Sequence, residues 1–240
     1  MSNPSRDAPT VAVLFSGGRD STLAALLLAP VYDVTLVTGT AGITDDWTHA
    51  RDAADALAAD AGTLRSGAGA TPDSLDPEFR RVDLRPEVFA AAARQIGRDG
   101  HPRAGIQRVH EHAVERVAVL EFDAVADGTR RDDRTPSVER ATAQSVEDRH
   151  GVDHLAPLSG VGHGAVRTMA DRLLRQERGP SATVGRADYE SELRALVREA
   201  GEAVDELFPD HQQSRVTGLR AAESERGSER RGCDECNEKS

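Results

Sequence analysis

Short apolar runs alternate with segments of helical spacing over the first two thirds of the chain. The apolar runs predict buried strands at residues 11–15, 33–38, 81–84, 122–126 and 152–156. The spacing between them predicts helices over residues 22–28, 45–61 and 106–120, and one more that begins at Pro86. Strands that alternate with helices are typical of a parallel sheet wound on both sides. The sequence therefore predicts an α/β protein with a Rossmann-like, doubly wound parallel sheet.

The pattern changes at about residue 165. Only helical spacing follows, most clearly over residues 189–208, and the chain then becomes polar. We therefore expect an α/β domain over residues 8–165, a helical C-terminal extension over residues 166–210, and a polar tail over residues 211–240. The order of this tail is left open.

The amino-acid composition indicates the cellular environment of the protein more clearly than its binding partners. The 240 residues include 30 basic and 41 acidic side chains, a net charge of −11, and Lys239 is the only lysine. This balance predicts a salt-adapted protein, as in a halophilic archaeon, so the overall charge does not exclude nucleic acid. The chain has no apolar run of about 18 residues and no apolar segment at its start. We expect a soluble cytoplasmic protein that does not span a membrane.

The hexapeptide from Ser16 to Ser21, SGGRDS, joins the first predicted strand to the first predicted helix. Glycines let backbone amides approach a ligand closely, and a helix N-terminus favours negative charge. The two serines add hydroxyl donors. The segment lacks the Gly-Lys-Ser/Thr ending of a Walker A loop. It predicts an anion-binding turn.

SGGRDS resembles the SGGxDS signature of the PP-loop ATP pyrophosphatases, also called adenine nucleotide alpha hydrolases, of the HUP superfamily. Its members cleave ATP between the alpha and beta phosphates, adenylate an acceptor and release pyrophosphate. The resemblance covers residues 10–175. It implies a HUP-type, PP-loop nucleotide-binding domain that binds ATP with Mg²⁺. It also implies that Asp20 is catalytic, supporting the loop or helping to hold metal, and that the ATP phosphates lie against Ser16, Gly17, Gly18 and Ser21.

A second charged loop, Asp127 to Arg134, follows the strand at residues 122–126. It resembles the second motif of the same family, Gly-x-x-x-x-Asp. The likeness makes Gly128 and Thr129 contacts of ATP, and the metal ligands would be Asp127, Asp132 and Asp133. A solvated, charge-balanced turn is the alternative. The family's later x-Pro-Leu turn resembles Ala156-Pro157-Leu158, after which His163 or Arg167 could supply a basic group.

Cys233 and Cys236 form a C-x-x-C pair in the polar tail. Three interpretations of this pair stay open. It could be a redox or sulfur-carrying dithiol, it could be half of a Zn²⁺ or iron–sulfur site, or it could have no role. Two tails in a homodimer could close a metal site. His49, His101, His150 and His154 are expected to be surface or structural residues. His110 and His112 do not share a helix face, so a zincin site is not supported.

The chain also resembles archaeal PP-loop proteins described as relatives or subunits of tRNA thiouridine-modifying enzymes. The resemblance implies an ATP-dependent adenylating enzyme that releases pyrophosphate and activates a tRNA base for thiolation. The two cysteines would handle the sulfur or a metal, and the partners would be ATP, tRNA and a sulfur donor. An amide-forming ligase acting on a small carboxylate and a non-catalytic ATP-binding module are the alternatives.

Overall fold

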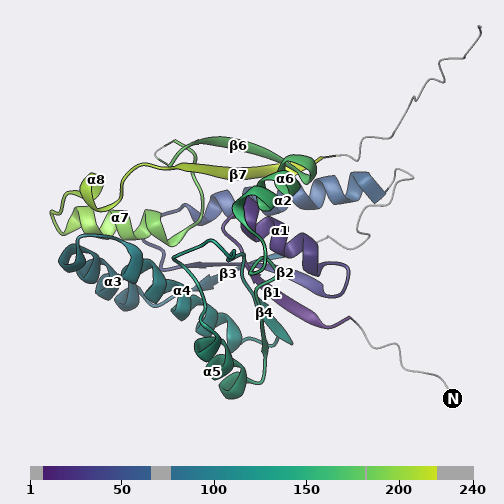
Figure 1. Cartoon of the computed structure of the whole chain (residues 1–240), viewed down its shortest axis with the longest axis horizontal. Coiled ribbons are helices and arrows are strands. Elements are labelled where there is room, and N and C mark those ends of the chain that lie inside the picture. The colour runs from purple at the N-terminus through teal and green to yellow at the C-terminus, as the bar shows by residue number, and fades with distance from the viewer. Residues whose placement is uncertain (1–7, 66–76, 182, 221–240) are drawn as a thin grey trace, which may run out of the picture.

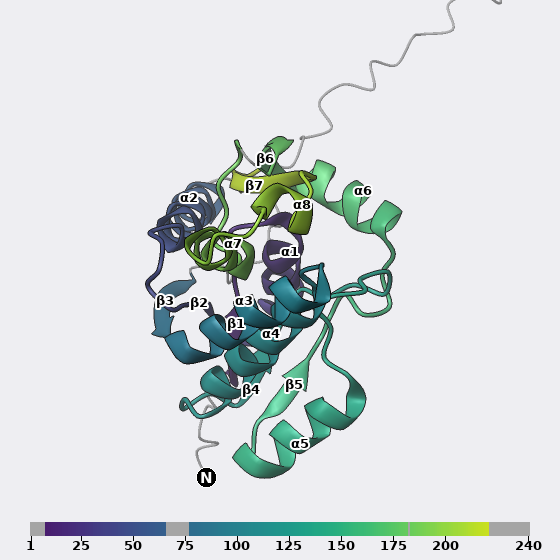
Figure 2. The same ribbon diagram turned by 90° about the vertical axis from the view of Figure 1, so that its left-hand side faces the viewer.

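The computed structural model of the chain describes residues 8–65, 77–181 and 183–220. Its centre is a five-stranded parallel sheet with the order β3–β2–β1–β4–β5, which Figure 2 shows from β3 at the left to β5 at the right. The strands are β1 (Thr10–Leu14), β2 (Asp33–Thr40), β3 (Glu78–Asp83), β4 (Ala124–Ala126) and β5 (Asp153–Leu155). The predicted α/β class and parallel sheet are therefore confirmed.

Helices cover both faces of this sheet (Figure 1). One face packs against α1 (Arg19–Leu28), α2 (Trp47–Arg65) and α6 (His163–Leu173). The other packs against α3 (Pro86–Asp99), α4 (Arg103–Ala118), α5 (Arg140–His150), α7 (Tyr189–Glu199) and α8 (Val204–Leu207). Side chains of a strand alternate between faces, so Val11 and Val13 enter the first core while Ala12 and Leu14 enter the second. The central strand is buried on both sides, and this is why it appears in the sequence as an unbroken apolar run.

The expectation of a purely helical segment after residue 165 is wrong. Strands β6 (Leu174–Pro180) and β7 (Gln212–Leu219) form an antiparallel two-stranded sheet, which lies over α1 and α2 in Figure 1. Most of their residues are polar because one face is exposed, and only Ser214, Val216 and Gly218 of β7 are buried. The predicted helix over residues 189–208 is divided into α7 and α8, with Gly201 at a φ of +80° between them. The proposed division into domains stays a prediction.

Glu192 of α7 holds the chain segment that follows β2. Its buried carboxylate accepts hydrogen bonds from Thr40 Oγ1 at 3.0 Å, from the Ala41 amide at 3.0 Å and from the Ile43 amide at 2.9 Å. These bonds satisfy amides that have left the sheet, and they connect the end of β2 to the C-terminal part of the chain.

Glu192→Gln is expected to lower the free energy of unfolding by about 1–3 kcal/mol, because an amide side chain accepts fewer and weaker hydrogen bonds than a carboxylate. Urea unfolding would measure the change. Glu199→Gln, at an exposed position near the end of the same helix, is the matched control and should leave the midpoint unchanged. Equal midpoints for both variants would contradict this role of Glu192.

Candidate functional site

The strand order reverses around β1, whose neighbours are β2 on one side and β4 on the other. In an open α/β sheet, ligands bind beyond the carboxyl ends of the strands at such a switch point. A cavity of about 630 Å³ lies here. It is lined by the residues that follow β1 and β4, by Gly39 of β2, and by two later segments, residues 186–190 and 211–214.

The β1–α1 loop uses its carbonyl groups for structure. The Ala187 amide donates to the Ser16 carbonyl at 3.1 Å, and the Val216 amide donates to the Gly17 carbonyl at 2.8 Å. The Gly18 carbonyl accepts from two hydroxyl groups of α1, those of Ser21 and Thr22. All three carbonyl groups are therefore occupied by residues of the chain itself.

The Ser16 amide donates to Ser21 Oγ at 3.4 Å, but two other amides of the same loop remain available to a ligand. Within the described ranges, no hydrogen-bond acceptor is found for the amides of Gly17 and Gly18. Helix α1 begins at Arg19, and the first amides of a helix have no acceptor inside it. Gly17 adopts a φ of +76°, which favours glycine. A loop with engaged carbonyls and open amides at a helix N-terminus is chemically suited to an anion.

Guanidinium groups extend this positive surface. Arg186 lies over the loop, since a Cβ atom at Gly18 would be 3.1 Å from its Cδ. Burial would lower the pKa of Arg186, but the Asp188 carboxylate, 2.7 Å from Nη2, raises it. Arg130 pairs with Asp133 and lies 3.5 Å from Asp20 Oδ2. Both arginines are thus held in place by carboxylates at the cavity wall.

The two charged loops of the sequence meet as expected from the parallel sheet. A Cβ atom at Gly128 would lie 2.7 Å from the Ser21 nitrogen and 2.8 Å from the Asp20 carbonyl carbon, so the second loop rests on the first turn of α1. Eight of the proposed site residues line the cavity: Ser16, Gly18, Asp20, Ser21, Asp127, Gly128, Thr129 and Asp133. Gly17 and Asp132 do not line it, and Cys233 and Cys236 lie outside the described residues.

The three carboxylates proposed as Mg²⁺ ligands do not face one another as one set. Asp132 accepts from the His163 amide at 2.9 Å, and Asp133 pairs with Arg130. Asp127 is buried at the end of β4. In the part of the chain that the structure describes, no group of three or more His, Cys, Asp or Glu side chains is arranged to hold a metal ion. The metal role of each carboxylate stays a prediction.

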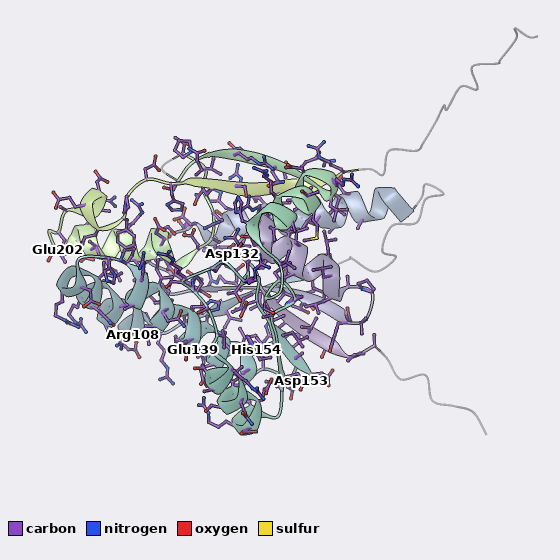
Figure 3. All side chains as sticks on the ribbon, viewed as in Figure 1. Arg108, Asp132, Glu139, Asp153, His154 and Glu202 are labelled. Atoms are coloured by element: carbon purple, nitrogen blue, oxygen red, sulfur yellow. The ribbon has the colours of Figure 1, made fainter. Side chains whose placement is uncertain are left out.

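Asp127 is held between two histidines that come from other elements. His154 Nε2 of β5 lies 3.0 Å from Asp127 Oδ2, and His110 Nε2 of α4 lies 3.6 Å from the same atom. The Thr129 amide donates to Oδ1 at 2.8 Å. Figure 3 shows His154 lower in the view, toward α5, and Asp132 higher, toward α1. Burial would raise the pKa of Asp127, but the two histidines and Thr129 hold that pKa well below its ordinary range.

Several cavity residues were not identified from the sequence. His154 was expected to be a surface or structural histidine, and His110 was given no role beyond the rejected zincin site. Both are near Asp127, and His110 lines the cavity. The position of His154 at the end of a predicted strand beside Asp127 was the available signal. No motif marks Arg186, Asp188 or Tyr189, which reach the cavity from the segment before and at the start of α7.

Among the described residues, no helix is both long and apolar enough to cross a membrane. The roles proposed for Cys233 and Cys236, whether with Zn²⁺ or as a sulfur carrier, and the homodimer stay predictions.

Known proteins with similar sequences and structures bear on the predicted activity. The uncharacterized protein MJ0690 of Methanocaldococcus jannaschii is 33% identical over 211 residues, covering 88% of this chain and 96% of that protein. A crystal structure from Methanocaldococcus jannaschii, described as a predicted subunit of tRNA methyltransferase, has a TM-score of 0.75 and 32% identity. That match covers 89% of this chain and 99% of the other.

This structural relative contradicts the predicted activity. Its description is that of a methyltransferase subunit and not of an ATP-dependent adenylating enzyme. The prediction of base adenylation for thiolation is therefore wrong, and its two alternatives, the ligase and the non-catalytic ATP-binding module, are set aside with it. Residues 10–69 and 60–218 match a family of unknown function, DUF7411, which accounts for most of the chain. The chain belongs to the DUF7411 family.

Proposed function

We propose that this protein is an enzyme component of tRNA modification, and that its cavity binds the phosphate groups of a nucleotide, ATP with Mg²⁺. The observation that carries the nucleotide is the β1–α1 loop at the end of the cavity, whose three carbonyls are engaged while the Gly17 and Gly18 amides have no acceptor among the described residues. The description of the relative from Methanocaldococcus jannaschii supports tRNA as the substrate. The resemblance of SGGRDS to the PP-loop signature supports ATP and a HUP-type sheet.

The chemistry of the cavity wall fits a phosphate chain. Amides and guanidinium groups such as that of Arg186 are the donors that bind phosphate oxygens in proteins. Mg²⁺ is usually held by one or two carboxylates together with phosphate oxygens, and Asp20 and Asp133 both line the cavity. The methyl donor S-adenosylmethionine carries no phosphate and would leave the loop amides unpaired. We therefore place a nucleotide at this loop, and not the methyl donor.

Arg186→Gln is expected to weaken ATP binding by roughly 10- to 100-fold, since a hydrogen bond to a charged group contributes about 1.5–3 kcal/mol. Titration calorimetry with Mg²⁺ and ATP at high salt would measure the dissociation constant. Arg98→Gln is the matched control, because Arg98 is exposed on α3, on the opposite face of the sheet from α1. Adenosine and S-adenosylmethionine should bind far more weakly than ATP. Equal affinities for adenosine and ATP would contradict a phosphate site.

A further inference from the structure

Trp47 is the only tryptophan of the chain. The guanidinium groups of two arginines lie over its ring. The Arg51 Cζ atom, one turn further along α2, lies 5.0 Å from the ring centroid. The Cζ atom of Arg81, from the edge strand β3, lies at the same distance. Trp47 is half-buried, and both arginines are exposed. Two separate elements thus bring two guanidinium groups against one indole ring at the surface.

This stack lies beside the cavity. Trp47 lines a second, narrow hollow together with Gly39 and Asp188, and these two residues also line the main cavity. The acidic partner of Arg81 is Asp83, at 3.3 Å, and the Asp83 side chain is 82% exposed, so that ion pair is weak. No ion pair of Arg51 occurs among the residues that the structure describes. Both guanidinium groups therefore remain available to a partner at the surface next to the hollow that Trp47 lines.

We propose that Trp47, Arg51 and Arg81 form a stacking platform for an unpaired base of the RNA that this protein modifies. The inference rests on the proposed function, in which tRNA is the substrate. Unpaired bases stack on aromatic rings and on guanidinium planes, and such stacking tolerates any base. A base on this platform would hold the RNA strand next to the cavity where the nucleotide binds.

The charge of the chain favours stacking over phosphate contacts as the main source of RNA affinity. Phosphate contacts release counterions, so they weaken steeply as salt rises, and the net charge of −11 opposes them further. Stacking between flat groups does not require a net positive protein surface. An acidic protein can therefore bind RNA through a small platform of this kind.

The test uses the full-length protein and Trp47 as a natural fluorophore. Total tRNA is expected to quench the fluorescence of Trp47, and ATP with Mg²⁺ is not. In fluorescence anisotropy with labelled tRNA, Trp47→Ala should weaken binding by roughly 5- to 100-fold. Arg51→Lys and Arg81→Lys keep the charge but remove the plane, so they should weaken tRNA binding several-fold at unchanged thermal stability. Arg98→Lys, on α3, should have no effect.

The outcomes separate the platform from the proposed function. If the wild type binds tRNA and both Arg→Lys variants and Trp47→Ala bind it equally well, the platform is overturned, and the arginines only cover the indole ring. If the wild type binds ATP but no tRNA, the tRNA part of the proposed function fails, and the platform fails with it. ATP affinity should be unchanged in all three variants, and a parallel loss of ATP binding would overturn a role specific to RNA.

Discussion

Gly128→Ala is expected to weaken ATP binding by about 10- to 100-fold, because an added methyl group would meet the backbone of α1. The added Cβ atom would lie 2.7 Å from the Ser21 nitrogen and 2.9 Å from the Asp20 carbonyl oxygen. These neighbours are backbone atoms of the first turn of α1, which cannot rotate away. The loop that begins at Asp127 must shift instead, at a cost of about 1–3 kcal/mol, and Arg130 and Asp133 shift with it.

The control for this variant is Gly160→Ala. Gly160 lies in the β5–α6 connection, and a Cβ atom there would meet nothing within 4 Å. Calorimetric titration with ATP and Mg²⁺ should give a wild-type dissociation constant for Gly160→Ala and a much larger one for Gly128→Ala. A wild-type constant for both variants would show that the contact between the two charged loops does not shape the site.

The second large effect is expected on stability. Asp127→Asn should lower the free energy of unfolding by about 3–5 kcal/mol, because it removes the charge from a buried carboxylate whose neighbours are His110 and His154. The exposed Asp153 at the start of β5 offers a matched control, and Asp153→Asn should change the unfolding free energy little. Guanidinium chloride unfolding, monitored by circular dichroism, would compare the three proteins.

The same pair of variants gives a pH dependence with a definite sign. The pKa of Asp127 is lower in the folded protein than in the unfolded chain, so its ionised form stabilises the fold at any pH above the ordinary aspartate value of about 4. That stabilisation is lost as the pH falls below about 4 toward the folded pKa. The stability difference between the wild type and Asp127→Asn should therefore be full at neutral pH and shrink in acid. A difference that grows in acid would contradict this assignment.

The sheet and the meeting of the two charged loops could be predicted from the sequence. The strands are buried on both faces, so their apolar runs stand out from the helices between them. The carboxyl ends of parallel strands lie at one edge of the sheet. The sequence therefore predicted that the segments after residues 15 and 126 lie close together. The contact of Gly128 with the first turn of α1 confirms this prediction.

The remainder of the site could not be predicted, because it depends on contacts between distant residues that produce no local pattern in the sequence. Arg186 precedes a helix in an irregular segment, and its role follows only from its place over Gly18. Strands β6 and β7 are polar because each exposes one face, so apolar runs do not reveal them. The stack on Trp47 joins α2 to an edge strand, and neither residue spacing nor composition indicates it.

The hydrogen bonds from Ala187 and Val216 to the β1–α1 loop have a consequence for the biosynthesis of the protein. The loop is synthesised well before Ala187 and Val216, the residues whose amides engage its carbonyls. A nascent chain can form β1, α1 and β2 early and still lack the hydrogen bonds that complete the proposed phosphate site until β7 has emerged. Ligand binding by truncated nascent chains should therefore appear abruptly, only after residue 216 has been added and has cleared the exit tunnel.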